Sequence, residues 1–133
     1  MRKFAFLVAA GAALVAGTGL QARERLTGEE KLAKQLEGRV AGEPVSCISL
    51  NNSRETQIID KTAIVFGRGN VIYVNRPAHP SSLDSDDIMV TRLTGSQLCR
   101  LDIVRMHDRS GGFYSGFVGL QDFVPYRRAT ARN

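Results

Sequence analysis

The segment QLCRLDIVRM, residues 97–106, decides the fold class of this 133-residue chain. Cys99, Leu101 and Ile103 alternate with charged residues, and a period of two is typical of a β-strand with one buried face. We expect these three side chains to point into a core. Because one of only two cysteines stands in this row, the segment predicts a central strand that is also covalently anchored.

The second cysteine, Cys47, lies in another β-like segment, Val45–Leu50. Two cysteines allow one intramolecular pairing. No C-x-x-C motif occurs, and neither histidine lies at metal-site spacing from a cysteine. We therefore predict a structural disulfide between Cys47 and Cys99. It closes a loop of roughly 50 residues, which in the chain-entropy model stabilises the fold by about 4 kcal/mol.

The first 22 residues have the three parts of a secretory signal peptide. The positively charged Met1–Lys3 precedes the apolar run Phe4–Ala16, and the small or polar residues Gly17–Ala22 follow. The run is shorter than the roughly 20 apolar residues that span a bilayer. We expect cleavage after Ala22 and no transmembrane segment thereafter. The predicted location is periplasmic or secreted, in an oxidising compartment that suits a disulfide.

The charge balance of the predicted exported chain is modest. The sequence has 18 basic and 13 acidic residues, and cleavage removes two of the basic ones, Arg2 and Lys3. The remaining excess of about three positive charges is ordinary for one domain and is no footprint of nucleic-acid binding. The sequence also contains no tryptophan on which bases could stack. We therefore predict no nucleic-acid partner.

The chain after the signal peptide divides into three predicted parts. Residues 23–43 form an N-terminal helix and linker, and the segment 38–44 is a turn-rich connection into the next part. Residues 44–126 form the β domain, and residues 127–133 form a disordered basic tail. Arginines in that tail would add weak attraction to anionic envelope lipids.

Local signals define the predicted helix. Thr27 and Glu30, three residues apart, have the spacing of a capping box, and acidic residues stand in the first turn. Leu32 and Leu36 form one apolar stripe at a spacing of four, and Gly38 suits the position after the helix. We expect this stripe to dock the helix on the core of its own domain.

Short β-like segments separated by turns fill the predicted β domain. The clearest is a hairpin, because Gly67–Asn70 is rich in residues that tolerate positive φ and lies between two apolar runs. The longest irregular stretch is Arg76–Asp87, with two prolines. No helical pattern separates the strands, so we predict a mainly β fold, a small antiparallel barrel or sandwich of about six strands with one short N-terminal helix and one disulfide.

A search for chemistry assigns no catalytic residue, metal or cofactor. His79, Asp84, Asp86 and Asp87 gather in the long loop, but the glycine and bidentate glutamate of a calcium loop are missing. His79 and His107 lie near serines or an aspartate, yet there is no G-x-S-x-G motif, and a triad is defined by geometry. A small hydrolase remains an alternative, although we expect that the protein is not an enzyme.

Two resemblances add expectations. Ser110–Tyr114 (SGGFY) fits S-G-x-x-Y and resembles the first motif of periplasmic inhibitors of C-type lysozyme, which implies that the Ser110 and Tyr114 hydroxyls enter a lysozyme cleft. The companion Y-x-x-x-K-G motif is absent from residues 117–126. A lysozyme-inhibitor-like protein is therefore an alternative function.

The second resemblance covers more of the chain. Four blocks are similar to a family of small exported (periplasmic) proteins from Gram-negative alphaproteobacteria whose function is unknown: Leu36–Ile48, Tyr73–Pro77, Ser96–Cys99 and Phe123–Tyr126. This resemblance implies export, one domain and the cysteine pair. It implies no catalytic or binding residue.

The resulting functional prediction is a non-enzymatic binding module for an unknown protein or envelope component. An aromatic residue beside an arginine and amides is a typical contact mixture. The candidate surface comprises the hairpin edge, the loop after it and the S-G-x-x-Y turn: Tyr73, Asn75, Arg76, His79, Ser110 and Tyr114. The alternative is that Tyr73 packs inward and Asn75 caps a turn.

Overall fold

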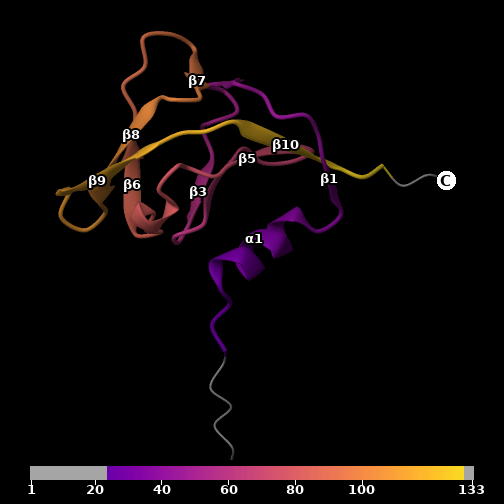
Figure 1. Ribbon diagram of the computed structural model, residues 1–133, viewed down its shortest axis with the longest axis horizontal. Helices are drawn as coiled ribbons and strands as arrows, with labels where there is room; N and C mark the ends of the chain where they lie inside the picture. The colour runs from indigo at the N-terminus through magenta and orange to yellow at the C-terminus, as the bar shows by residue number, and fades with distance from the viewer. Residues whose placement is uncertain (1–23, 131–133) are drawn as a thin grey trace, which may run out of the picture.

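The structure, a computed structural model, describes residues 24–130 (Figure 1). The predicted signal peptide, its cleavage site and the last three residues of the predicted tail lie outside the described residues. Ten strands, one α-helix and one 3-10 turn follow in this order: α1 (Gly28–Leu36), β1 (Arg39–Ala41), β2 (Cys47–Ser49), β3 (Thr56–Ile59), β4 (Ala63–Phe66), β5 (Val71–Asn75), η1 (Pro80–Ser82), β6 (Asp87–Val90), β7 (Gln97–Cys99), β8 (Ile103–Asp108), β9 (Tyr114–Gly119) and β10 (Phe123–Arg128).

The mainly β fold is confirmed, but its strands are more numerous than the six expected. They form three antiparallel sheets with the orders β1-β10-β5-β4-β3, β2-β7 and β6-β8-β9. No closed barrel forms within residues 24–130. In the same residues no helix is long and apolar enough to cross a bilayer.

Helix α1 begins and ends where local chemistry predicts. The Thr27 hydroxyl accepts a hydrogen bond from Glu30 N at 3.2 Å, and the Glu30 carboxylate accepts one from Thr27 N at 2.7 Å, so the capping box is confirmed. Gly38 has a φ of +70° just after the helix, a conformation that costs glycine little. Leu32 is fully buried beneath the helix, which confirms docking of the helix on its own domain.

The central part of the five-stranded sheet is buried on both faces. Helix α1 covers one face, where Leu32 packs against residues of β3, β4 and β5 (Figure 1). The other face packs against the two smaller sheets through a core that contains Phe66, Phe123 and Leu98. This two-sided burial explains why β4 reads as the continuous apolar run Ala63–Phe66, in which every residue is buried.

The predicted hairpin is confirmed as β4 and β5. The two strands pair Ile64 with Asn75 and Phe66 with Tyr73. Gly67 turns between them with a φ of +90°, which strains any residue with a Cβ.

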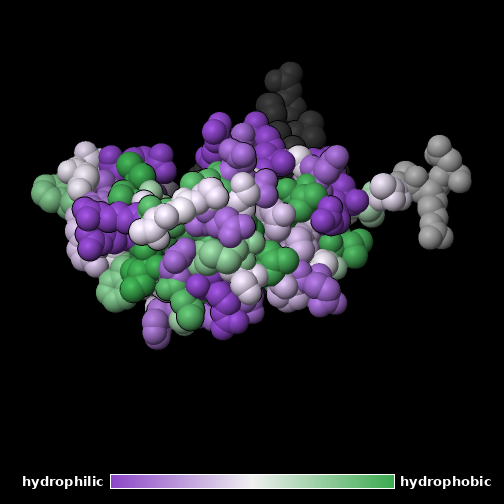
Figure 2. Space-filling view, turned by 90° about the horizontal axis from the view of Figure 1, so that it is seen from above, coloured by the Kyte–Doolittle hydropathy of each residue, from purple (hydrophilic) through white to green (hydrophobic). Residues whose placement is uncertain are grey.

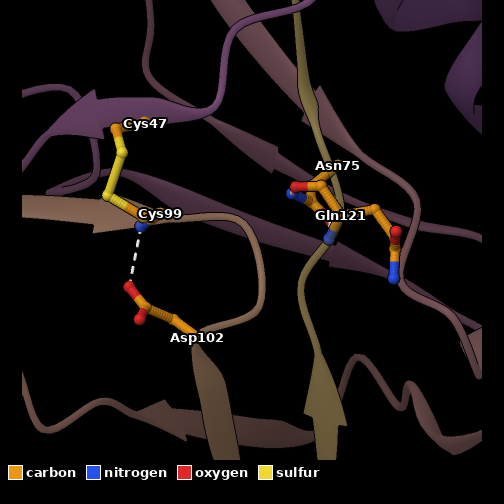
Figure 3. Close-up of a disulfide and its surroundings, with 5 residues drawn as sticks. All are labelled: Cys47, Asn75, Cys99, Asp102 and Gln121. Atoms are coloured by element: carbon orange, nitrogen blue, oxygen red, sulfur yellow. Dashed lines mark hydrogen bonds between the residues drawn. A yellow bond between two sulfur atoms is a disulfide. The ribbon is translucent and has the colours of Figure 1, made fainter.

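The predicted central strand is wrong, because the segment breaks into β7 and β8. Leu101 adopts a φ of +70° between them, and the Asp102 carboxylate accepts a hydrogen bond from Cys99 N at 2.7 Å (Figure 3). The same turn is fixed to the last part of the chain, since Leu101 N donates to Leu120 O at 2.9 Å.

The predicted inward row is also wrong. Leu101 and Ile103 are 70% and 61% exposed, whereas Leu98, Val104 and Met106 are buried. The alternation in the sequence is real, but the row that faces the core is the other one, both before and after the turn.

Two predicted boundaries are also wrong. The segment 38–44, expected as a connection, contains strand β1, which pairs Arg39 with Arg128 and Ala41 with Tyr126. For the same reason the tail does not begin at residue 127. Arg127 and Arg128 belong to β10, and Ala129 N donates to Gly38 O at 2.9 Å.

The disulfide joins Cys47 and Cys99, as predicted. The two residues lie directly opposite each other in the β2–β7 pair (Figure 3). The bridge therefore fixes the smallest sheet, whose Ile48 and Leu98 side chains enter the core.

Candidate functional site

The predicted surface around β5 is largely structural. Tyr73 is partly buried and packs against the core cluster, and Asn75 is fully buried. The Asn75 amide donates to Gln121 O at 2.6 Å and accepts from Gln121 N at 3.1 Å (Figure 3). Asn75 therefore satisfies the backbone just before β10 and is not available to a partner.

Arg76 connects β5 with the helix. Its guanidinium donates to both carboxylate oxygens of Glu29, at 2.7 and 3.1 Å. These hydrogen bonds lower the pKa of Glu29 and raise the pKa of Arg76. His79 is exposed and immediately precedes the turn η1. Of the four predicted residues in and after β5, only Arg76 and His79 are exposed on the surface.

Ser110 and Tyr114 lie on a different sheet, at the β8–β9 turn. The Ser110 hydroxyl donates to the Asp108 carboxylate at 2.6 Å, and Gly111 N donates to the same oxygen at 2.7 Å. These bonds lower the pKa of Asp108. Tyr114 packs edge-on against His107, with 5.9 Å between ring centroids. The structure thus divides the predicted surface between two sheets.

Neither histidine side chain is paired with a serine hydroxyl within the described residues. His107 Nδ1 lies 3.2 Å from Gly112 O. Within residues 24–130 no hydrogen bond joins a serine hydroxyl to His79 or His107, and no group of three or more His, Cys, Asp or Glu side chains could hold a metal ion.

A cleft that sequence reasoning missed lies between β3 and β6. Its volume is about 870 Å³, and residues from both strands line it. The apolar lining includes Ile58, Phe66, Met89, Leu93 and Leu98. Because β3 and β6 are edge strands of two different sheets, the cleft separates two strands that would have to pair for a barrel to close.

Strand β3 turns backbone groups toward this cleft. Thr56 lies opposite Phe66 in the β3–β4 pair, and Gly67 N donates to Glu55 O at 2.7 Å. In an antiparallel pair the residues alternate between bonding the neighbour and pointing away. Since Glu55 and Gln57 bond β4, the backbone N–H and C=O groups of Thr56 and Ile58 point to the open edge.

Strand β6 does the same from the other side. Arg109 N donates to Asp86 O at 3.1 Å, in register with the pairing of Ile88 with His107. Asp86 and Ile88 therefore bond β8, and the backbone groups of Met89 point to the cleft. Within residues 24–130 neither β3 nor β6 has a strand partner on its cleft side.

Hydrogen bonds close one end of the cleft. Lys61 N, just after β3, donates to Leu83 O at 3.0 Å, and Ser85 N donates to the Asp60 carboxylate at 2.6 Å. The bond from Ser85 lowers the pKa of Asp60, and Lys31, 3.8 Å away, lowers it further. The end of β3 is thus tied to the segment before β6.

Charged groups line the cleft beside its apolar residues. Arg54 and Arg109 are both exposed. Asp87 is 7% exposed, and its carboxylate accepts a hydrogen bond from the Ser115 hydroxyl at 2.7 Å. The two guanidinium groups are therefore available to an anionic ligand, while the one buried carboxylate already has a partner.

The sequence carried a partial signal for this cleft. Thr56–Ile59 and Asp87–Val90 both have β-like sequences, but the gap between the two strands depends on which strands pair. Comparison with family profiles, with curated proteins and with solved structures finds no match for this chain.

Proposed function

We propose that this protein is a non-enzymatic binding module that takes up an extended polypeptide segment in the cleft between β3 and β6. The observation that carries the proposal is the pair of open strand edges at one cavity of about 870 Å³. An extended chain placed there can hydrogen-bond to Thr56 and Ile58 on one side and to Met89 on the other. Such strand addition is a recurring mode of peptide recognition.

Side chains give this mode its specificity. Alternate residues of an added strand point toward the cleft floor, where the partly buried side chains of Ile58, Met89 and Leu93 offer apolar contact. Arg54 and Arg109 favour a segment that carries a carboxylate. A strand in this position would join the five-stranded sheet to the three-stranded sheet. The fold that we propose for the free protein is therefore a β-sandwich that is open along the cleft.

The proposed setting is the periplasm or the extracellular space. The disulfide Cys47–Cys99 supports it, because such bonds persist in oxidising compartments. The likeness of four sequence blocks to small exported alphaproteobacterial proteins supports it as well. The proposed partner is accordingly a protein or envelope component of that compartment.

Selection from a random twelve-residue peptide library tests the proposal. Peptides selected on the wild-type protein should bind Thr56→Pro at least about tenfold more weakly, because proline removes an N–H that points to the cleft and leaves the β4 ladder intact. The matched control is Ala41→Pro. Val40 and Gly42 bond β10, so the Ala41 N–H also points to an open edge, on β1.

Two results would refute the proposed function. One is a selection that yields no peptide. The other is equal binding by Thr56→Pro and Ala41→Pro. Arg109→Gln adds a test of charge, since selected peptides with a carboxylate should lose affinity for it and lose part of their salt dependence.

A further inference from the structure

On the outward face of the β6–β8–β9 sheet, side chains from the three strands line up in two cross-strand rows. Register places Ile88 beside His107 and His107 beside Tyr114. The next row places Val90 beside Arg105, and Arg105 beside Phe117. The face is therefore a mixture of apolar, aromatic and basic side chains from three strands.

These side chains are unusually open to solvent for their type. Phe117 is 57% exposed and Phe113, in the turn between β8 and β9, is 76% exposed. Ile103, Ile88 and Val90 are each more than 40% exposed. Figure 2 shows hydrophobic side chains among hydrophilic ones at the left-hand end of the molecule, where Figure 1 places β6, β8 and β9. Contiguous exposed apolar surface of this kind marks an interaction site.

The charged side chains of this face are arginines. Arg105 stands on it beside His107, and Arg92 lines the same hollow with Val90 and Ile103. No carboxylate occupies an outward position on these three strands within the described residues.

The nearby carboxylates are used inside turns. Asp102 accepts from Cys99 N, and Asp108 accepts from Ser110 and Gly111. These carboxylates keep their charge, but within residues 24–130 neither Arg92 nor Arg105 forms a salt bridge, so both guanidinium groups are available to an anionic surface.

Charge and shape together select the occupant. A second copy of the chain would bring Arg105 toward the same basic face, and such like-charge contact is unfavourable. The sheet presents an open surface with the Phe113 side chain at a hairpin tip. Aromatic side chains at protruding positions, flanked by arginine, are what a membrane interface favours.

We propose that the outward face of β6–β8–β9 docks on a bilayer that contains anionic phospholipid. Phe113 and Phe117 enter the boundary between headgroups and acyl chains, while Arg92 and Arg105 stay at the level of the phosphates. None of these four residues lines the cleft, although Ile88 borders both the cleft and this face. This inference is independent of the proposed peptide binding.

Vesicle co-sedimentation of the predicted exported chain, residues 23–133, tests this inference. The wild-type protein should bind vesicles of equal parts phosphatidylglycerol and phosphatidylcholine, and should bind pure phosphatidylcholine much more weakly. Arg92→Gln and Arg105→Gln should each weaken binding about fivefold, since one basic residue near a charged surface contributes that factor. Phe113→Ser with Phe117→Ser should weaken it at least about tenfold.

The matched control lies on the opposite end of the fold. Val40 on β1 and Lys34 on α1 are both exposed, so Val40→Ser with Lys34→Gln removes one apolar and one basic side chain elsewhere. This variant should bind vesicles like the wild type. All replaced side chains are exposed, and an unchanged urea midpoint verifies that each variant is folded.

Several outcomes overturn the inference. They are absence of binding to the anionic vesicles, equal binding to neutral ones, or equal loss in the control variant. Capture of an acidic protein by the wild type, with no vesicle binding, would assign this face to a protein partner instead and likewise overturn it. Thr56→Pro should bind vesicles normally, which separates failure here from failure of the proposed peptide function.

Discussion

Replacing both cysteines tests how much of the fold depends on the bridge between β2 and β7. In Cys47→Ser with Cys99→Ser, the sequence separation of 52 residues gives the size of the effect. The chain-entropy model assigns a loop of this length about 14 cal/mol/K, or about 4 kcal/mol at 25 °C. This is a large share of the roughly 5–15 kcal/mol that keeps a domain folded.

Urea unfolding followed by circular dichroism measures this loss. With an m-value of about 2 kcal/mol/M, the midpoint should fall by about 2 M. Reduced wild-type protein is the control, because it lacks the bridge but keeps the native side chains. The reduced wild-type protein should have the same urea midpoint as the double variant. A loss below about 1 kcal/mol would show that the unfolded chain is not constrained by the bridge, and would refute the reasoning.

Two further predictions concern single buried or capping groups. Asn75→Ala leaves Gln121 N–H and C=O without their side-chain partner, so we expect a loss of about 2–4 kcal/mol in urea unfolding, and a loss under 1 kcal/mol would contradict the burial argument. Asp60 has a pKa below its ordinary value of 3.8, first because Ser85 N donates to it. The Asp60 carboxylate therefore stabilises the folded protein fully above about pH 3.8, and this stabilisation is lost as the pH falls through the lower pKa of the folded state. The wild type should exceed Asp60→Asn in stability near pH 6 and approach it near pH 2. The carboxylate is 42% exposed, which limits the difference to about 1 kcal/mol or less; a difference independent of pH would contradict this account.

What the sequence predicts correctly depends on neighbouring residues. The capping box of Thr27 and Glu30 and the hairpin around Gly67 are local, because their hydrogen bonds or dihedral angles involve residues within a few positions. The cysteine pairing was predictable for another reason: two cysteines allow one bond. These features required no knowledge of which distant strands pair.

The errors concern distant partners. Strand β1 has three residues, partly or fully exposed, so no apolar alternation distinguishes it from a connection. Leu101 gives no turn signal, because leucine rarely adopts its φ of +70°. That conformation is held by Leu120 and by Asp102, and Leu120 is 19 positions away along the chain. Nothing local to Leu101 therefore signals that the strand breaks there.

The cleft was beyond prediction for a related reason. Both Thr56–Ile59 and Asp87–Val90 have ordinary β patterns, and each forms a regular ladder on one side. Whether their other edges meet depends on how two sheets pack over Phe66 and Leu98, which is set by the shape of the core. The bonds that Lys61 and Asp60 make to the segment before β6 draw the strands together at one end only. An edge is thus a property of the packed molecule, and it becomes a candidate binding site where packing leaves its backbone groups without a strand partner.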